Sequence, residues 1–396
     1  MSYDVDAVRA GFPALEDGYA YLDGAAGTQV PTSVIEAIAT TYRRGIGNVG
    51  GAFPASHRAD EIVGRARQAV ADLVGGAPDG VVFGPNMTTL TYRMAATLAA
   101  GWKPGDEVVV TRLDHDANVR PWVQAAARAG ATVKWAEIDA AGELPVAQFD
   151  GLLSDRTRLV AVTAASNVLG TRPDVASITA VAHAAGALTY VDGVHATPHG
   201  PTDRRALGAD FYATSAYKWC GPHVGAVVAD PALLDTLRPD KLASSRDEVP
   251  HRFETGTLPF ADLAGVTAAV DHLAGLTGHE GTRRERLLAS MNAAEAHEQQ
   301  LFTRLLDGLR GIPGVTVQGA PARRTAVAYF TVGGQTPRET AELLAAARVN
   351  VWNGHNYAWE LTGALGIRDS GSAVRASIIH YNTAEEVDRL LTALST

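Results

Sequence analysis

The sequence lacks most of the features that mark exported or membrane proteins. It contains a single cysteine in 396 residues, so no intramolecular disulfide can form, which fits a reducing compartment. No apolar stretch approaches the length that spans a membrane. The opening residues, Met1-Ser-Tyr-Asp-Val-Asp, carry acids where a signal peptide carries bases. We therefore predict a soluble protein of the cytoplasm.

Basic segments and metal-binding motifs are also missing. The net charge is −9 and no basic run occurs. The chain therefore lacks the basic surface that a polyanionic partner such as nucleic acid would bind. Several histidines are expected on helical or loop surfaces without a companion ligand at metal spacing, namely His183, His199, His272 and His297. The sequence thus predicts no nucleic-acid partner, no membrane contact and no metal site.

The chain has only four lysines, and one of them stands where an α/β strand is expected to end. Lys218 closes the β-rich run that starts at Phe211, just before a Gly-Pro turn. Upstream, the apolar run from Leu188 ends in Asp192. Two such strands in one parallel sheet would deliver an amine and a carboxylate to the same crevice at their carboxyl ends.

This pair of side chains suits pyridoxal phosphate. A lysine amine condenses with its aldehyde, and a carboxylate keeps its pyridine nitrogen protonated, so that the ring accepts an electron pair from the α-carbon of the substrate. A strand-end aspartate is often only a cap, and a lone lysine is usually a solvated charge. Their occurrence together, at this spacing, favours a site for pyridoxal phosphate.

The pattern of secondary structure predicts the sheet that this site needs. Helical and β-rich segments alternate through the first two thirds of the chain, which is typical of a mostly parallel sheet covered on both faces. The expected helices include 31–44, 59–74 and 88–100. The expected strands are 81–83, 107–111, 132–136, 159–163, 188–191, 211–214 and 225–228. The fold class is therefore α/β, with one large seven-stranded sheet.

A second, smaller domain is expected to follow the sheet. At 396 residues with 46% hydrophobic content, the chain exceeds one compact domain. Apolar residues recur at helical spacing from Leu287 to Leu309, which predicts one long amphipathic helix that ends at Gly311 and Pro313. We predict an N-terminal segment, 1–15, that packs with the small domain, a large cofactor-binding domain, 16–280, and a small C-terminal α+β domain, 281–396.

A series of motifs in a fixed order resembles a known family. Along the chain stand Tyr21-Leu-Asp-Gly-Ala-Ala, Asp192-Gly-Val-His, Ser215-Ala-Tyr-Lys, Arg375-Ala-Ser, Tyr381-Asn-Thr and Glu386-Val-Asp-Arg-Leu. Over nearly its whole length the sequence resembles the class V aminotransferase family of fold-type I pyridoxal phosphate enzymes. Within that family, it most resembles group II cysteine desulfurases and selenocysteine lyases. The resemblance implies a homodimer with shared active sites.

The resemblance also implies a role for each matching residue. Lys218 would bind the cofactor covalently, Asp192 would pair with the pyridine nitrogen, and His115 would stack on the ring face. Arg375 would clamp the substrate carboxylate through a bidentate pair. Residues implied around the cofactor, with its phosphate at a helix N-terminus, are Asn86, Met87, Thr88, Asn167, His195, Ser215 and Thr257 of the partner subunit. Residues implied around the substrate are Ala25, His355 and Tyr357.

Departures from the family pattern bear on the reaction. Desulfurases of this type carry a loop reading Gly-His-His-Cys-Ala, and this chain reads Gly354-His-Asn-Tyr-Ala, so the persulfide-forming cysteine is absent. A phenol has a pKa of about 10 and is a poor nucleophile toward sulfur, so Tyr357 is no substitute. The sole cysteine, Cys220, is expected to be buried and structural. Further departures are His195 for the usual Gln, Tyr217 for the usual His, and Trp352 for a frequent Arg.

These departures leave several reactions open. We predict an enzyme in which Lys218 removes the α-hydrogen of an amino acid. Loss of a β-substituent, as in a C–S lyase or a desulfurase-like enzyme without persulfide chemistry, is the first expectation. The second is epimerisation, as in an isopenicillin N epimerase-like enzyme, with Tyr357, His355 or Tyr217 as the acid on the second face, and the third is transamination. From another class, the chain would be a catalytically inactive binding protein, but its retained lysine, aspartate, histidine and arginine argue against this.

Overall fold

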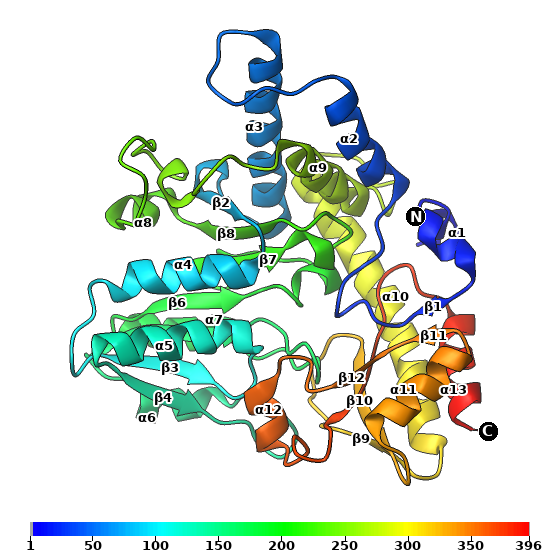
Figure 1. Cartoon of the computed structure of the whole chain (residues 1–396). Helices are drawn as coiled ribbons and strands as arrows, with labels where there is room; N and C mark the ends of the chain where they lie inside the picture. Colours follow the sequence, from blue (N-terminus) through cyan, green and yellow to red (C-terminus); the bar gives the residue numbers. More distant parts are fainter. Residues whose placement is uncertain (1–2, 396) are drawn as a thin grey trace.

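A seven-stranded sheet forms the centre of the larger part of the molecule (Figure 1). The computed structural model describes residues 3–395, so the first two residues of the predicted N-terminal segment and the last residue of the small domain lie outside the described range. Six of the strands run in one direction, and β8 is antiparallel to both of its neighbours. The strand order is β2 (Val81–Gly84), β8 (Gly225–Ala229), β7 (Phe211–Ser215), β6 (Leu188–Asp192), β5 (Thr157–Thr163), β3 (Glu107–Thr111) and β4 (Thr132–Ala136). The predicted α/β class and the seven-stranded sheet are confirmed.

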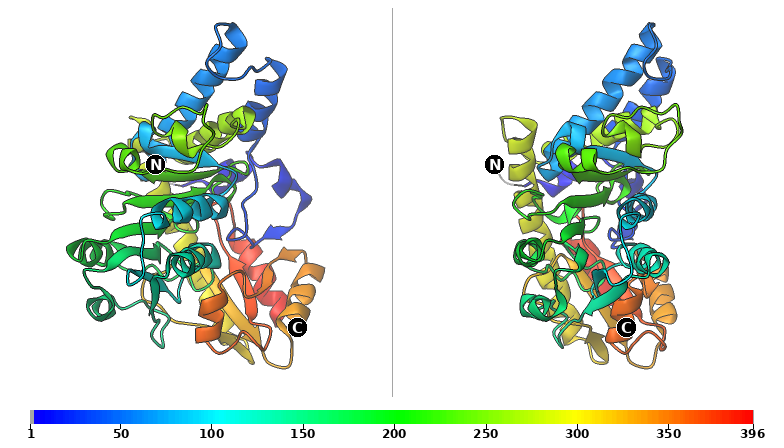
Figure 2. Two further views of the ribbon diagram at one scale, coloured as in Figure 1. Left: turned by 60° about the vertical axis from the view of Figure 1, so that its left-hand side comes forward. Right: turned by 90° about the vertical axis from the view of Figure 1, so that its left-hand side faces the viewer.

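Both faces of this sheet are covered, because its strands are apolar on both sides. Val108 and Val110 pack in one hydrophobic cluster with residues of α4 (Met87–Ala99) and α5 (Arg120–Ala129). Val109, which points to the opposite face, packs in the other cluster. That second cluster includes residues of α3 (Pro54–Val74), α7 (Val175–Ala184), α9 (Phe260–Ala274) and α10 (Arg283–Gly311). Helices accordingly lie on both sides of the sheet in the right-hand view of Figure 2.

The C-terminal part contains an antiparallel sheet of four strands in the order β12 (Trp352–Gly354), β13 (Ala373–Ser377), β10 (Val327–Val332) and β9 (Val315–Val317). A third cluster joins this sheet to α10, α11 (Pro337–Ala346) and α13 (Ala384–Leu394). Near the N-terminus, β1 (Ala20–Tyr21) pairs in parallel with β11 (Val349–Asn350), so this early segment lies beside the C-terminal part. The division into 1–15, 16–280 and 281–396 remains our proposal. The remaining α-helices of the described range are α1 (Val5–Arg9), α2 (Thr32–Arg43), α6 (Phe149–Leu152), α8 (Pro231–Thr236) and α12 (Trp359–Ala364).

The long helix predicted from Leu287 to Gly311 is present as α10, with a capping box at Thr282 and Glu285. The structure corrects one prediction: Lys218 does not end a strand. Strand β7 stops at Ser215, and Lys218 closes a short 3-10 turn from Ala216. The turn forms because the Ala216 carbonyl accepts hydrogen bonds from later backbone N–H groups, and the chain then returns as β8. Within residues 3–395, no helix combines the length and the apolar character that crossing a bilayer requires.

Two histidines are not where the sequence placed them. His199 is only 1% exposed, and its Nδ1 atom lies 2.7 Å from a carboxylate oxygen of Glu298. His272 does have companion ligand atoms, because Cys220 and His380 each place one within 4.8 Å of its ring nitrogen. These partners lie far apart in the sequence and meet only through the tertiary fold, so spacing along the chain could not reveal them.

Candidate active site

A cavity of about 930 Å³ lies where strands of the large sheet end against the C-terminal part. Thr163, Asp192 and Ser215, at the carboxyl ends of β5, β6 and β7, line one side of it. Parallel strands commonly place ligand sites at this edge. Every residue that the sequence assigned to the site, apart from Thr257, lines the same cavity: Ala25, Asn86, Met87, Thr88, His115, Asn167, Asp192, His195, Ser215, Lys218, His355, Tyr357 and Arg375.

Lys218 lines the cavity, and its amine contacts the segment that contains Ala25 and Ala26. Its Nζ atom donates to the carbonyl oxygen of Ala26 at 2.9 Å and to that of Ala25. Burial lowers the pKa of the amine to about 7, and nearby Arg375 adds to this effect, while Asp192 opposes it. An amine with this pKa is partly neutral near pH 7, which is the form that attacks a carbonyl.

Asp192 is a buried carboxylate with few partners. Its Oδ1 atom accepts a hydrogen bond of 2.9 Å from the backbone N–H of Val194. Burial raises the pKa of the carboxyl to about 6, and the Val194 N–H and Lys218 both work against that rise. A cationic group entering the cavity would therefore stabilise the ionised carboxylate.

The N-terminus of α4 opens onto the cavity and is fixed by three contacts. The Asn86 side chain caps the helix by accepting from the Thr89 N–H at 2.9 Å. The Met87 N–H donates to Ser215 Oγ at 2.9 Å, which ties the helix start to the end of β7. Gly225 permits this close packing, because a Cβ atom there would lie 2.3 Å from the carbonyl carbon of Asn86. Helix N-termini of this kind favour anions such as phosphate.

His115 lies beside the cavity as a neutral ring. Its Nδ1 atom accepts from the Ala117 N–H at 3.0 Å, which leaves the proton on Nε2. Burial lowers the pKa of this imidazole to about 3, with Lys218 and Arg375 contributing. Its ring centroid lies 5.4 Å from that of Tyr357. The uncharged ring offers a flat face to a planar ligand.

Arg375 and the loop from Gly354 to Ala358 form the wall opposite the sheet. Arg375 Nη1 donates to the carbonyl oxygen of Asn167 at 3.0 Å, and Asn167 Nδ2 donates to the carbonyl oxygen of Asn356 at 2.8 Å. The Asp116 N–H donates to the Tyr357 carbonyl oxygen at 2.7 Å. Asn356 and Tyr357 both adopt positive φ, at 49° and 59°. The loop is thus held from both parts of the molecule, while the Tyr357 side chain is 68% exposed.

Two buried polar atoms at the cavity wall lack partners within the described residues. These are Asn167 Oδ1 and Arg375 Nε. Buried polar groups are normally hydrogen-bonded, so both atoms have unused capacity to bind a polar ligand. His195, by contrast, is turned toward the C-terminal part, where its Nε2 atom lies 2.9 Å from Thr325 Oγ1.

Several lining residues were not found from the sequence. Arg120 forms ion pairs with Asp116 at 2.8 Å and with Glu360 at 2.7 Å. The four-residue spacing of Asp116 and Arg120 was a usable signal, whereas Glu360 comes from α12, distant in the sequence. The other unassigned lining side chains with polar groups include Thr89, Tyr92, Thr163, His223, Asn353 and Asn356. Thr257 is exposed and does not line the cavity of its own chain.

Comparisons with known proteins agree with this geometry. The aminotransferase class-V family model matches residues 20–390. An uncharacterised protein of Mycobacterium tuberculosis is 38% identical, over 100% of this chain and 99% of its own length. A cysteine desulfurase of Klebsiella pneumoniae is 33% identical, over 100% of this chain and 98% of its own length. The crystal structure of the cysteine desulfurase CsdA from Escherichia coli matches 99% of this chain and 98% of its own, with a TM-score of 0.88 and 29% identity.

Members of this family bind pyridoxal phosphate. The family model and the relatives that match extend over almost the entire length of the chain and not over one motif. The chain therefore belongs to the aminotransferase class-V family and is similar to its cysteine desulfurases.

Proposed function

We propose that this chain is a pyridoxal phosphate enzyme that acts at the α-carbon of an amino acid and eliminates a β-substituent, as a C–S lyase does. One observation carries the proposal. Lys218, Asp192, His115 and Arg375 line a single cavity, and the loop opposite them holds Tyr357 where desulfurases of this type carry a cysteine. The four cavity residues suit amino-acid chemistry on the cofactor. The loop lacks the nucleophile for persulfide formation.

The residues around the cavity fit the cofactor. The anion-favouring start of α4, with Asn86, Met87 and Thr88, would hold the phosphate together with Ser215. Asp192 would face the pyridine nitrogen, and the unpartnered Asn167 Oδ1 indicates room for a further polar contact. When bound, pyridoxal phosphate supplies an electron sink for the bonds of the α-carbon. His115 and His195 complete the set of side chains assigned to the cofactor.

Lys218 is the proposed base at the α-carbon. The burial that lowers its pKa to about 7 makes a neutral amine available near physiological pH. Arg375 would hold the substrate carboxylate, because its guanidinium is buried at the cavity wall with Nε unpartnered. Holding the carboxylate fixes the direction of the α-hydrogen relative to the lysine, which is a positioning effect.

Epimerisation is the second candidate, because the cavity also offers acids beyond the lysine. Tyr217 lines it, and Lys218 Nζ lies 5.4 Å from the centroid of the Tyr217 ring. Burial raises the pKa of Tyr217, so the phenol remains protonated at neutral pH. Tyr357 and His355 line the cavity on the loop side. One of these side chains would return a proton to the face opposite the base.

We also propose a cytoplasmic homodimer with shared sites. Thr257 is exposed and lies outside the cavity of its own chain, as expected for a residue that serves the neighbouring site. An isologous dimer would place two such residues in two equivalent cavities.

Product analysis with an S-substituted cysteine tests the reaction. Elimination yields pyruvate, ammonia and a free thiol without any added keto acid. Epimerisation in heavy water would instead give α-deuterium with scrambled configuration and no ammonia. Transamination would convert the cofactor to its amine form and then depend on an added keto acid. Either of the last two results contradicts the proposed elimination, and no reaction with any amino acid would favour an inactive binding protein.

A further inference from the structure

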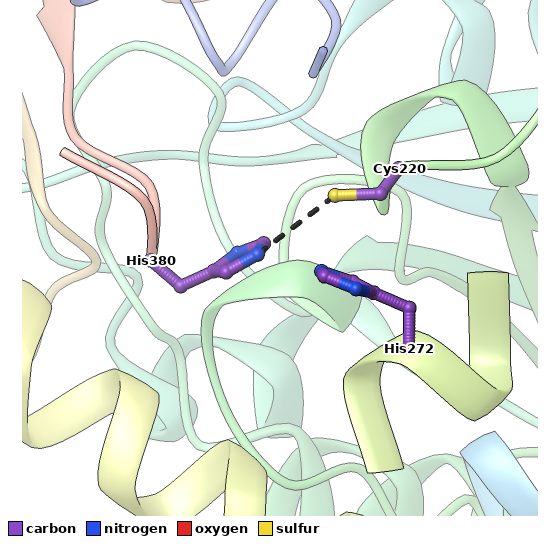
Figure 3. A group of neighbouring side chains, drawn as sticks. All are labelled: Cys220, His272 and His380. Atoms are coloured by element: carbon purple, nitrogen blue, oxygen red, sulfur yellow. Dashed lines mark hydrogen bonds between the residues drawn. The ribbon is translucent and has the colours of Figure 1, made fainter. Parts of the chain in front are cut away.

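We propose that Cys220, His272 and His380 form a binding site for a divalent cation that binds thiolate and imidazole ligands, as zinc does. This site is separate from the active-site cavity. The three side chains point toward one another from three different parts of the fold (Figure 3). Cys220 follows the Lys218 turn, His272 lies on α9, and His380 follows β13. None of the three lines the active-site cavity, so this inference does not depend on the proposed reaction.

The spacing of the three ligand atoms is close to that of a tetrahedral site. The Cys220 Sγ atom lies 3.9 Å from His380 Nε2, and all three ligand atoms lie within 4.8 Å of one another. Zinc bonds of about 2.3 Å to sulfur and about 2.0 Å to nitrogen imply ligand atoms ~3.5 Å apart. Side-chain movements of ~1 Å would therefore close the site around an ion.

The two histidines are already in the chemical state that a metal requires. His272 Nε2 is buried and has no hydrogen-bond partner among residues 3–395. Burial lowers the pKa of His272 to about 4 and that of His380 well below its usual value, so both rings are neutral and keep a lone pair. Burial raises the pKa of the Cys220 thiol to about 12, so the thiol keeps its proton until a cation binds. Coordination would replace the thiol proton, which passes to solvent, as metal binding to cysteine requires.

The surroundings hold the three ligands in place. The Cys220 N–H donates to Thr28 Oγ1 at 2.7 Å, and Tyr3 donates its hydroxyl to the carbonyl oxygen of His380 at 2.5 Å. The Phe12 ring packs edge-on against His272, with centroids 5.0 Å apart. Such second contacts orient metal ligands in known sites. A bound ion would cross-link the lysine turn, the large part and the C-terminal part.

Cadmium titration of the metal-free holoenzyme tests the site. Because Cys220 is the only cysteine, any ultraviolet charge-transfer band between thiolate and cadmium reports this position alone. We expect one Cd²⁺ per chain by elemental analysis, a saturating band, and a higher melting temperature. The same measurements follow for Cys220→Ser, for His272→Asn and for His183→Asn, a histidine of α7 outside the cluster.

We expect the band to vanish in Cys220→Ser and the affinity to fall about tenfold or more in His272→Asn, while the His183→Asn control binds as wild type. No thiolate band on the folded wild-type holoenzyme under excess Cd²⁺ would overturn the proposal. So would equal affinity in His272→Asn and the control. If a variant fails to fold, the wild-type titration still decides, since it needs only the single thiol.

Discussion

Arg375 Nη1 lies 3.0 Å from the carbonyl oxygen of Asn167 and donates a hydrogen bond to it, which joins β13 of the C-terminal sheet to the segment after β5 of the large sheet. Asn167 in turn donates to Asn356 of the cavity loop at 2.8 Å. One chain of contacts thus positions the guanidinium, the large sheet and the loop relative to one another. Arg375 Nε has no partner within the described residues, and we propose that a substrate carboxylate binds this guanidinium.

Replacing this arginine should weaken substrate recognition. Loss of one member of a desolvated charge pair costs about 2 to 5 kcal/mol, so Arg375→Ala should lower kcat/KM by a factor of tens to thousands. Cofactor content, read from the visible absorbance, should stay near one per chain. Arg338→Ala, on the exposed face of α11, is the matched control and should behave as wild type. An unchanged kcat/KM in Arg375→Ala would mean that the carboxylate binds elsewhere.

Attachment of the cofactor should depend on pH. The amine of Lys218 has its pKa lowered to about 7, and only the neutral amine attacks the aldehyde. The rate at which apoenzyme takes up pyridoxal phosphate should therefore rise with pH and level off above about 7, falling roughly tenfold per unit below that point. Arg375→Ala removes a nearby positive charge, so its profile should shift to higher pH. Stopped-flow absorbance gives both profiles, and a wild-type midpoint near the ordinary lysine pKa would contradict this view of the site.

Turnover of cysteine should leave no persulfide on the protein. The only thiol is Cys220, which is 0% exposed, has a pKa raised to about 12 by burial, and does not line the cavity. Without a bound cation this thiol stays protonated near neutral pH, and it does not face the cavity where the substrate sulfur would lie. Intact-protein mass spectrometry during turnover should show no added sulfur atom. Sulfane sulfur accumulating on Cys220 would restore a desulfurase assignment.

Thr257 should serve the neighbouring subunit. We expect a dimer by analytical ultracentrifugation and a lower cofactor affinity in Thr257→Val, with Thr255→Val as the exposed neighbour for comparison. The substitution removes a hydroxyl that would donate a hydrogen bond to the cofactor phosphate of the neighbouring subunit. Both sites of the dimer should weaken equally. A monomer that binds the cofactor tightly would refute the shared site.

The sequence could predict much of the fold and most of the cavity wall, for reasons visible at particular residues. Unbroken apolar runs such as Val108 to Val110 are typical of strands buried on both faces, so the sheet could be predicted. Asp192 and Ser215 end such strands, which placed them at one edge. Family motifs added His115 and Arg375, whose surroundings give no local signal of a site.

Long-range partners could not be predicted from sequence spacing. Glu360 reaches Arg120 from another part of the chain, and His199 is buried because Glu298 of α10 packs against it. The Cys220, His272 and His380 cluster has the same origin, since its members meet only when the lysine turn, α9 and the C-terminal part come together. Lys218 lies on a 3-10 turn because of hydrogen bonds to Ala216, which residue types alone do not specify.

The attachment point of the cofactor tests the central claim most directly. Purified enzyme should be yellow, and borohydride reduction followed by peptide mass mapping should find the reduced cofactor on Lys218, whose amine lies in the cavity opposite Arg375 and the loop. The other lysines, Lys103, Lys134 and Lys241, do not line the cavity and serve as internal controls in the same digest. Label on Lys218 alone is the predicted result. Label on any of the other three, with Lys218 unmodified, would contradict the assignment of the site.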